Sequence, residues 1–375
     1  MKPFRSGKFI QQYKYKSFLP TLLKESFDWR SATVLNLLEK ASAQLGELNS
    51  YSKTVPDINF FIEMHKTKEA TTSSRIEGTR TSIDEAVLSE NNVAPERRDD
   101  WEEVQNYIKA LNHSVERLGE LPLCIRLLRE AHEILLSGVR GENKLPGIIR
   151  TSQNWIGGAD IKSASFIPPH HNDLLNLLTD LENFWHEESS EMPYLIKAAI
   201  THYQFETIHP FLDGNGRIGR LLITLQLLDA ELLDRPTLYI SDFFEKNRSA
   251  YYDALMTTRR SNDMDHWLRL FLTGVIETAE SSKKTFVQIG ELRKSYTEQI
   301  TQLGRRSKLA DKLLLKMYSN PIMSPREVES ELGIAPATAN RLLKAMEQIG
   351  LVKEKSGRER NRLYVLHAYL NVFKA

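Results

Sequence analysis

Apolar side chains recur every three or four residues along most of the chain, and this spacing predicts a mainly α-helical protein. Asp57 is expected to cap one of these helices at its start, and Gly78 is expected to end it. Leu121-Pro122 divides a long apolar stretch into two or more core helices. The predicted helices cover residues 35–48, 56–78, 101–136 with this break, 172–186, 194–208 and the polar stretch 277–309.

Two stretches depart from the helical spacing. Residues 147–158 and 166–169 are strand-like runs separated by turn residues, and they predict a small β-hairpin over about 156–167. Residues 1–30 interleave basic and aromatic side chains, which predicts an extended arm packed on the domain. The alternatives are a hairpin that only covers the core and an arm that contacts nucleic acid.

The C-terminal part, residues 311–375, resembles a winged helix-turn-helix. Its predicted order is helix, helix, short turn, helix and strand, with 336–349 as the recognition helix, 355–362 as the tip of the wing and 363–366 as its return strand. The recognition helix would expose Thr338, Asn340, Arg341 and Lys344. Basic side chains only slightly outnumber acidic ones over residues 321–375, so DNA and a protein both remain open as partners.

Composition narrows the class of protein. The 375 residues suffice for two or three domains, and 41% hydrophobic with 26% charged residues is ordinary for a globular protein. The single cysteine cannot form an internal disulfide, and no apolar run approaches the roughly 18 residues that span a bilayer. We therefore expect a cytoplasmic protein without a membrane partner. A net charge of +1 argues against a nucleic-acid footprint over the whole surface.

The strongest chemical signal is the stretch 207–220, with the sequence Thr-Ile-His-Pro-Phe-Leu-Asp-Gly-Asn-Gly-Arg-Ile-Gly-Arg. Its glycines allow backbone N–H groups to approach a ligand, and the helix expected to start here directs its positive end to the same place. Arg217 and Arg220 are three residues apart, so their guanidinium groups are expected to reach the same oxyanions. The stretch therefore predicts a polyphosphate site.

Two further side chains of this stretch add chemistry. Asp213 supplies a hard oxygen ligand that suits Mg²⁺, and His209 is able to take up a proton near neutral pH. The glycine spacing also matches a dinucleotide-binding loop, but that loop needs a strand before it, whereas residues 195–208 have helical spacing.

Residues 209–220 resemble, at twelve contiguous positions, the complete signature of Fic-domain proteins, which transfer AMP from ATP to protein hydroxyls. The resemblance implies a helical catalytic domain in which His209 is the base and Asp213 holds Mg²⁺. The nucleotide-binding residues that it implies are Gly214, Asn215, Gly216, Arg217, Gly219 and Arg220.

The same resemblance implies roles for two other segments. Asn247, Tyr251 and Tyr252 are candidates for the nucleoside pocket, with a core role for one tyrosine as the alternative. In Fic proteins the hairpin is a flap that binds the target peptide by strand addition. The expected target-binding residues of this flap are Ile156, Gly157, Gly158 and Ile167.

Ser73 and Glu77 lie four residues apart at the end of the predicted helix 56–78. With Gly78 they resemble the inhibitory helix that some Fic proteins carry N-terminal to the catalytic core. The resemblance implies that Glu77 pairs with Arg220 and so occupies the arginine that should hold the γ-phosphate of ATP. A structural or solvated acid is the alternative for Glu77.

The expected organisation is an N-terminal region 1–100 with an inhibitory helix at about 57–78, a catalytic core 101–280, a helical linker 281–310 and a winged helix 311–375. The expected function is transfer of AMP from ATP, with Mg²⁺, to a Ser, Thr or Tyr hydroxyl of a target protein or of the chain itself, restrained by Glu77. A nucleotide-sensing DNA-binding regulator and a hydrolase that removes AMP at the same site are alternatives. Regulation through a homodimer interface also stays open.

Overall fold

A computed structural model describes residues 3–25, 27–187, 191–355, 357 and 362–374. The protein is mainly helical, as the sequence predicts. The helices are α1 (Ala32–Thr54), α2 (Ile58–Ile76), α3 (Ile83–Ala86), α4 (Arg98–Arg117), α5 (Ile125–Leu136), α6 (Leu174–His186), α7 (Tyr194–Ile208), α8 (Asn215–Asp229), α9 (Ser241–Lys246), α10 (Arg248–Ser261), α11 (Met264–Thr301), α12 (Ser307–Ser319), α13 (Pro325–Leu332), α14 (Pro336–Gln348) and α15 (His367–Val372). The strands are β1 (Gly7–Gln11), β2 (Lys16–Pro20), β3 (Ile322–Met323), β4 (Lys353–Glu354) and β5 (Tyr364–Val365).

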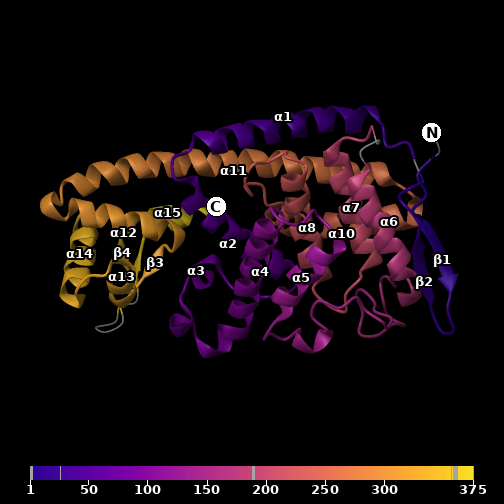
Figure 1. Cartoon of the computed structure of the whole chain (residues 1–375), viewed down its shortest axis with the longest axis horizontal. Coiled ribbons are helices and arrows are strands. Elements are labelled where there is room, and N and C mark those ends of the chain that lie inside the picture. The colour runs from indigo at the N-terminus through magenta and orange to yellow at the C-terminus, as the bar shows by residue number, and fades with distance from the viewer. Residues whose placement is uncertain (1–2, 26, 188–190, 356, 358–361, 375) are drawn as a thin grey trace.

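The long helix α11 gives the molecule its elongated shape. It lies beside α1, with the β1–β2 hairpin at one end and the segment α12–α15 at the other (Figure 1). Asp263 caps α11 by accepting the His266 N–H at 3.0 Å, and the helix then continues without interruption for 38 residues. The domain boundary expected near residue 280 therefore falls inside one continuous helix.

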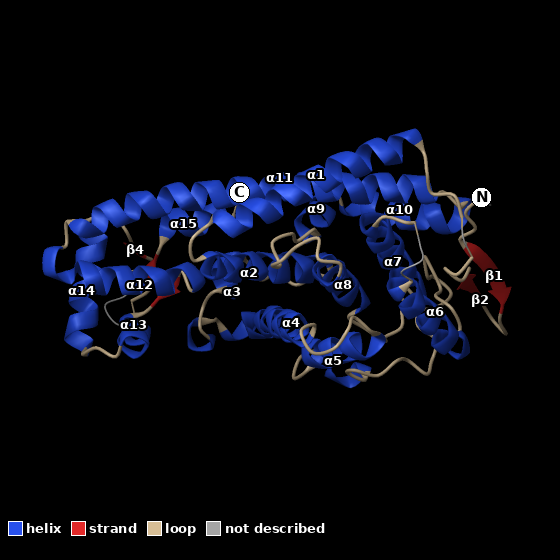
Figure 2. Ribbon diagram, turned by 45° about the horizontal axis from the view of Figure 1, so that its top comes forward, coloured by secondary structure: helices blue, strands red, loops and turns tan. Residues whose placement is uncertain are grey.

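Helices α7 and α8 form the centre of the fold. Figure 2 shows α1 and α11 on one side of the central helices α2, α7 and α8, with α4 and α5 on the other side. Every residue of α7 from Leu195 to Ile208 is buried, because neighbouring helices cover all of its faces. None of the helices in the described ranges is long and apolar enough to cross a membrane.

Two local predictions are wrong. The expected hairpin at 156–167 shrinks to a single bridge, in which Ile156 donates to the Phe166 carbonyl at 2.9 Å and Phe166 donates back at 3.1 Å. Gly157 and Gly158 have φ angles of 68° and 75°, so the chain turns away before a second pair can form. Asp57 precedes α2 as expected but does not cap it, because its carboxylate pairs with Arg293.

The C-terminal segment has the predicted order of elements. The helices α12, α13 and α14 are followed by β4 and β5, and β5 lies between β3 and β4 in an antiparallel sheet. Ser324 and Glu327 form a capping box at the start of α13. The expected wing tip spans residues 355–362, of which 356 and 358–361 lie outside the described residues.

An aromatic cluster fixes this segment on α2. The Phe61 ring of α2 meets Tyr318 of α12 at a centroid distance of 5.0 Å, and Tyr318 meets Tyr369 of α15 at 5.1 Å. The Tyr369 hydroxyl donates to the Tyr318 carbonyl at 2.9 Å. All three side chains are at least 99% buried, so the apolar contact and the satisfied hydroxyl together hold α2, α12 and α15 in one core.

This packing predicts the effect of a truncation. Phe61→Ala should lower the free energy of unfolding by about 3–5 kcal/mol, because it removes a fully buried ring and leaves a cavity. Tyr13→Ala, at a side chain that is 92% exposed, should change it by no more than about 0.5 kcal/mol. Urea unfolding of both variants measures the two values, and equal destabilisation would contradict the packing.

Candidate functional site

The stretch 207–220 forms a loop between two central helices. His209 ends α7 with a φ of 51°, and Gly214 precedes α8 with a φ of 73°. The Asn215 side chain closes this loop, since its Oδ1 accepts the Phe211 N–H at 2.8 Å and its Nδ2 donates to the Phe211 carbonyl at 2.9 Å. Asn215 therefore offers a ligand its backbone N–H rather than its side chain, which the sequence had placed on the nucleotide.

His132 of α5 holds one side of the motif loop in place. Its Nε2 donates to the Asp213 carbonyl at 3.0 Å, its Nδ1 accepts the Gly147 N–H at 2.8 Å, and its ring stacks on Phe211 at 3.8 Å. Burial lowers the pKa of His132 to about 4, so the imidazole is neutral and its two nitrogens have the opposite roles that these bonds require.

Arg150 supports the loop from the other side. Its guanidinium donates to the His209 carbonyl at 2.9 Å, to the Pro169 carbonyl at 2.7 Å and to the Ser152 carbonyl at 3.0 Å. The side chain is 1% exposed. We call residues 156–166, which the Ile156–Phe166 bridge closes, the bridged loop. Arg150 therefore connects the segment before this bridged loop to the motif. No local sequence pattern predicts this role for Arg150.

A cavity of about 280 Å³ lies over the motif loop. It is enclosed by the end of α2, the bridged loop, the start of α8 and one face of α10. Its lining residues are Glu77, Trp155, Ile156, Gly157, Glu206, His209, Leu212, Asp213, Gly214, Asn215, Gly216, Arg220, Tyr251, Tyr252, Leu255 and Arg259. Most of the residues that the sequence predicted therefore meet in one place, although they come from four parts of the chain.

Arg220 makes the central contacts of this cavity. Its Nε donates to Ser73 Oγ at 2.8 Å, and its Nη2 donates to the Ser73 carbonyl at 2.9 Å and to Glu77 Oε1 at 2.7 Å. The Arg220 side chain is 1% exposed and that of Glu77 is 33% exposed. Burial raises the pKa of the Glu77 carboxyl, but the Arg220 guanidinium more than offsets this and leaves the pKa below its usual range. The expected pairing of Glu77 with Arg220 is thus present in the structure.

Glycine at position 216 makes room for this carboxylate. A Cβ atom on Gly216 would lie 2.3 Å from Glu77 Oε1, so the carboxylate rests directly against the first turn of α8. The positive end of a helix stabilises an anion at this position. Arg220 and α8 therefore form an anion site, which the protein fills with its own glutamate.

Arg217 does not join Arg220 at this site. Its Nη1 donates to Glu103 of α4 at 3.1 Å, its side chain is 5% exposed, and it does not line the cavity. The expectation that both arginines bind one anion is therefore not met in this structure. Gly219 also lies behind the cavity, where a Cβ atom would approach Glu206 Oε1 to 2.3 Å.

His209 and Glu206 face each other across one helical turn. The His209 Nδ1 lies 3.9 Å from a carboxylate oxygen of Glu206. Neither this nitrogen nor Glu206 Oε1 has a hydrogen-bond partner among the described residues. Burial, with the nearby cations Arg259 and Arg150, lowers the pKa of His209 to about 3, so its imidazole is neutral. Burial raises the pKa of Glu206 to about 7.

The proposed nucleoside residues have three different environments. Tyr251 is 1% exposed, and its hydroxyl donates to Nε2 of the buried His202, whose Nδ1 donates to the Gly219 carbonyl; Tyr251 is therefore a core residue that borders the cavity. Tyr252 is 37% exposed and lines the cavity. Asn247 does not line it, because its Nδ2 donates to the Phe243 carbonyl between α9 and α10.

The bridged loop contributes only part of the expected flap residues. Ile156 and Gly157 line the cavity, whereas Gly158 and Ile167 do not. Sequence reasoning missed Glu206 and Arg259. Glu206 lies one helical turn before His209, a spacing that could have identified it, but Arg259 has no local pattern and reaches the site through its bonds to Thr207 Oγ1 and the Glu206 carbonyl.

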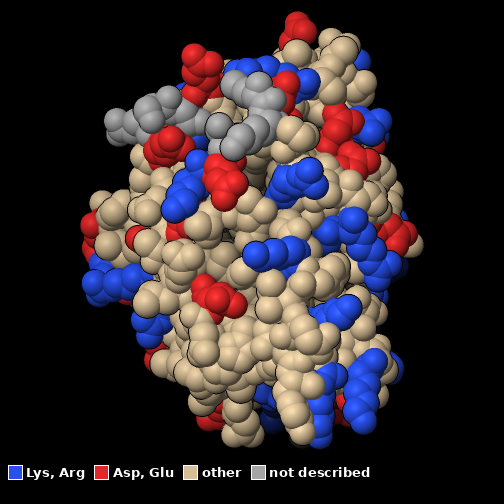
Figure 3. Space-filling view, turned by 90° about the vertical axis from the view of Figure 1, so that its right-hand side faces the viewer, with Lys and Arg blue, Asp and Glu red and all other residues tan. Residues whose placement is uncertain are grey.

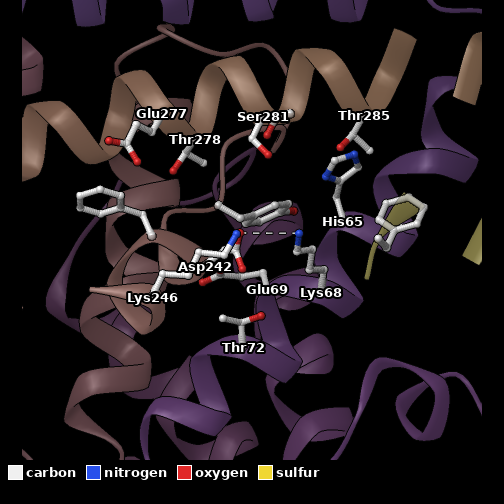
Figure 4. Close-up of a pocket in the computed structure, with 14 residues that line it drawn as sticks. His65, Lys68, Glu69, Thr72, Asp242, Lys246, Glu277, Thr278, Ser281 and Thr285 are labelled. Atoms are coloured by element: carbon white, nitrogen blue, oxygen red, sulfur yellow. Dashed lines mark hydrogen bonds and ion pairs between the residues drawn. The ribbon is translucent and has the colours of Figure 1, made fainter. Parts of the chain in front are cut away.

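A second cavity, of about 160 Å³, lies between α2, α9 and α11 and contains none of the motif residues (Figure 4). Its charges compensate each other: Lys246 donates to Asp242 at 2.9 Å, and Lys68 lies 3.7 Å from the same oxygen. The buried Glu69 accepts from Ser241 and from Tyr107. Because this second cavity contains none of the motif residues, we assign the function to the cavity over the motif.

The raised pKa of Glu206 predicts how stability changes with pH. The pKa of Glu206 in the folded protein, about 7, exceeds the ordinary value of 4.5, so the folded state holds the carboxyl proton more tightly than the unfolded state does. The contribution of this protonated carboxyl to the free energy of unfolding is fully present below pH 4.5 and is lost as pH rises towards 7. The free energy of unfolding of the wild type should therefore fall between pH 5 and pH 8 by up to about 3 kcal/mol more than that of Glu206→Gln. Urea unfolding at both pH values tests this, with Glu39→Gln at an exposed acid of α1 as the control. Equal pH dependence in wild type and Glu206→Gln would contradict the burial of a titrating carboxyl.

Comparison with known proteins shows to which family this chain is similar. The model of the Fic/DOC family N-terminal region matches residues 35–116, and that of the Fic/DOC family matches residues 122–227. The first range contains Ser73 and Glu77, and the second contains the whole stretch 207–220. Both sides of the Glu77–Arg220 contact thus fall within matched regions.

Two curated relatives have moderate identity. The protein adenylyltransferase Fic of Drosophila willistoni is 26% identical over 319 residues, which cover 82% of this chain and 57% of that protein. The protein adenylyltransferase fic-1 of Caenorhabditis briggsae is 28% identical over 174 residues, which cover 44% of this chain and 31% of that protein. The chain thus matches about a third to somewhat over half of the length of these relatives.

A solved structure shares the fold. The crystal structure of a Fic family protein from Desulfovibrio desulfuricans G20 has a TM-score of 0.57 to this structure at 20% identity. The match covers 90% of this chain and 96% of that chain. With both family models matched and the fold shared, the chain belongs to the Fic/DOC family.

Proposed function

We propose that this chain is a protein adenylyltransferase, which moves AMP from ATP to a Ser, Thr or Tyr hydroxyl of a target protein or of itself. The observation that carries the proposal is that one cavity is lined both by His209 and by the anion site formed by Arg220 and the start of α8. The names of the curated relatives support the same activity.

The anion site suits the phosphates of ATP. Arg220 already binds one carboxylate there, and the first turn of α8 directs its backbone N–H groups to the same point. Tyr252 and Leu255 line the same cavity and offer apolar faces against which an adenine ring can pack. The Arg217 guanidinium would reach the phosphates only after leaving Glu103.

In the proposed step, the hydroxyl oxygen of the target attacks the α-phosphorus of ATP. The new oxygen–phosphorus bond forms as the bond to the β-phosphate oxygen breaks, so pyrophosphate leaves and AMP stays on the target. His209 takes the hydroxyl proton, and its neutral imidazole has a free lone pair for this purpose. Arg220 and the start of α8 stabilise the negative charge on the phosphates.

Asp213 is the residue that we propose to hold Mg²⁺. Its side chain is 46% exposed, and its Oδ1 accepts the Gly214 N–H at 2.6 Å, so one face of the carboxylate remains open. The described residues contain no group of three or more possible metal ligands. A single carboxylate nevertheless fits Mg²⁺, which takes its other ligands from substrate phosphates and water and neutralises their charge.

We further propose that Glu77 restrains the enzyme. Its carboxylate lies at the anion site, so a γ-phosphate and Glu77 would compete for the same guanidinium. Two unit charges 4 Å apart interact by roughly 4 kcal/mol at an effective dielectric constant near 20, before any desolvation cost. An interaction of this size is large enough to displace a triphosphate from its productive position.

Removal of Glu77 should therefore accelerate transfer. With Mg²⁺ and α-³²P-labelled ATP, Glu77→Ala should label protein at least about tenfold faster than wild type, because the ion pair that it removes is worth more than 1.4 kcal/mol. Glu63→Ala, which removes a half-buried acid from the same helix that pairs with Lys66 and does not line the cavity, should label at the wild-type rate. Glu77→Ala/His209→Ala should give no label.

A rate for Glu77→Ala no higher than wild type would refute the restraint. An absence of label in every variant would refute the transferase itself and favour the two alternatives. Loss of AMP from a pre-labelled protein would then identify the hydrolase, and DNA binding without transfer would identify the nucleotide-sensing regulator.

A groove in the C-terminal segment favours a second function, DNA binding. It measures about 1330 Å³ and lies between α13, α14 and the 3₁₀ turn Glu90–Asn92. Its charged lining residues are four basic ones, Arg326, Arg341, Lys344 and Arg362, and two acidic ones, Glu327 and Glu329. Asn340, Arg341 and Lys344 are exposed on α14, as a recognition helix requires, whereas Thr338 is half-buried. We propose that the segment is a winged helix that binds duplex DNA in this groove.

DNA binding should depend on the basic side chains of α14. The full-length protein should shift a pool of short DNA duplexes at low salt, and Arg341→Ala/Lys344→Ala should reduce the slope of log affinity against log salt by about two. Lys308→Ala/Lys312→Ala, at exposed lysines of α12, should leave the slope unchanged. If wild type gives no shift at low salt, this function is excluded.

A further inference from the structure

All charged side chains of the β1–β2 hairpin are basic. Between residues 2 and 24 the sequence contains Lys and Arg but no Asp or Glu. Arg5, Lys8, Lys14 and Lys16 are exposed, and no carboxylate of the described residues forms an ion pair with them. Figure 3 looks onto this end of the molecule and shows that Lys and Arg side chains outnumber acidic ones over its lower right part. The hairpin is therefore an uncompensated positive surface.

Backbone and ring contacts join the hairpin to the wall of the cavity. The Phe18 N–H of β2 donates to the Ile167 carbonyl at 2.9 Å, and the Phe18 ring meets Phe166 at a centroid distance of 5.6 Å. Phe166 is bridged in turn to Ile156, which lines the cavity. The hairpin thus lies one chain segment away from the place where an acceptor hydroxyl would enter.

Exposed aromatic rings accompany this charge. Phe9 on β1 is 51% exposed, Tyr13 at the turn of the hairpin is 92% exposed, and Trp155 beside Ile156 is 42% exposed. Large exposed aromatic side chains with nearby cations are typical of surfaces that bind polypeptides. Such rings also stack on nucleic-acid bases, so the position of the hairpin beside the cavity decides between the two partners.

We propose that the β1–β2 hairpin is a docking surface that selects acidic polypeptides as targets of the transfer reaction. This proposal rests on the proposed adenylyltransferase function. In it, the hairpin binds the part of the target chain that flanks the acceptor hydroxyl. Because the hairpin adjoins the cavity wall at Phe166 and Ile167, we assign to it the chain that flanks a hydroxyl held beside Ile156 and His209, with Glu or Asp side chains of that chain on the exposed lysines. Opposite charges accelerate such an encounter and exclude basic partners.

Binding can be tested without the reaction. The probe is a fluorescein-labelled, glutamate-rich peptide with one central threonine, and its control has glutamine in place of glutamate. Full-length wild type should bind the acidic probe, more weakly as salt increases, and Lys8→Glu/Lys16→Glu should bind it at least about tenfold more weakly. Lys308→Glu/Lys312→Glu has the same change in net charge at the opposite end of the molecule and should bind like wild type.

Equal affinity of wild type and Lys8→Glu/Lys16→Glu for the acidic probe, or equal affinity of wild type for both probes, would overturn the proposal. Binding of a labelled single-stranded oligonucleotide through Lys8 and Lys16, without binding of the acidic probe, would also overturn it and identify nucleic acid as the partner. Transfer is tested separately in Glu77→Ala protein. If that protein labels nothing although the acidic probe binds at the hairpin, the adenylyltransferase function fails and not the docking surface.

Discussion

The cavity and the helices around it depend on the buried guanidinium of Arg220. Arg220 lies in the centre of the fold with 1% of its side chain exposed, and a charge in that position must be compensated by other groups. Ser73 supplies a hydroxyl and a carbonyl, and Glu77 supplies the opposite charge. These contacts fix the end of α2 against α8. The same guanidinium therefore holds the fold together and forms the anion site of the cavity.

This double role explains why the restraint by Glu77 and the binding of a nucleotide are linked in our proposal. A free anion site would leave Arg220 buried and only partly compensated, which is costly. Glu77 satisfies the guanidinium when no phosphate is present, and a phosphate can satisfy it only if Glu77 leaves. The exchange replaces one anion with another, so its free energy is the difference between two strong interactions.

The sequence predicted the parts of this site whose residues are close together or carry a family signature. The helical spacing of apolar residues predicted α7, and the glycines predicted where α8 starts. The family resemblance predicted the pairing of Glu77 with Arg220. Sequence reasoning failed for side chains whose position is set by a partner far away in the sequence. Arg217 turns to Glu103, more than a hundred positions earlier, and His132 and Arg150 hold the motif loop from segments without a pattern. The prediction of a hairpin at 156–167 failed because Gly157 and Gly158 adopt positive φ angles that strand propensity does not reveal.

The glycines of the motif have a more specific meaning in the structure than close approach to a phosphate. Gly216 leaves room for the Glu77 carboxylate and Gly219 for that of Glu206, so two acids pack against the first turns of α8. Burial raises the pKa of Glu206 to about 7, and the negative charge of Glu77 contributes to this rise. Since a bound phosphate would take the place of Glu77 with at least the same charge, Glu206 would keep its raised pKa during the exchange. With a pKa of about 7, Glu206 beside His209 is only partly ionised near neutral pH, so it adds less negative charge than an ordinary glutamate to a cavity that must accept a polyanion.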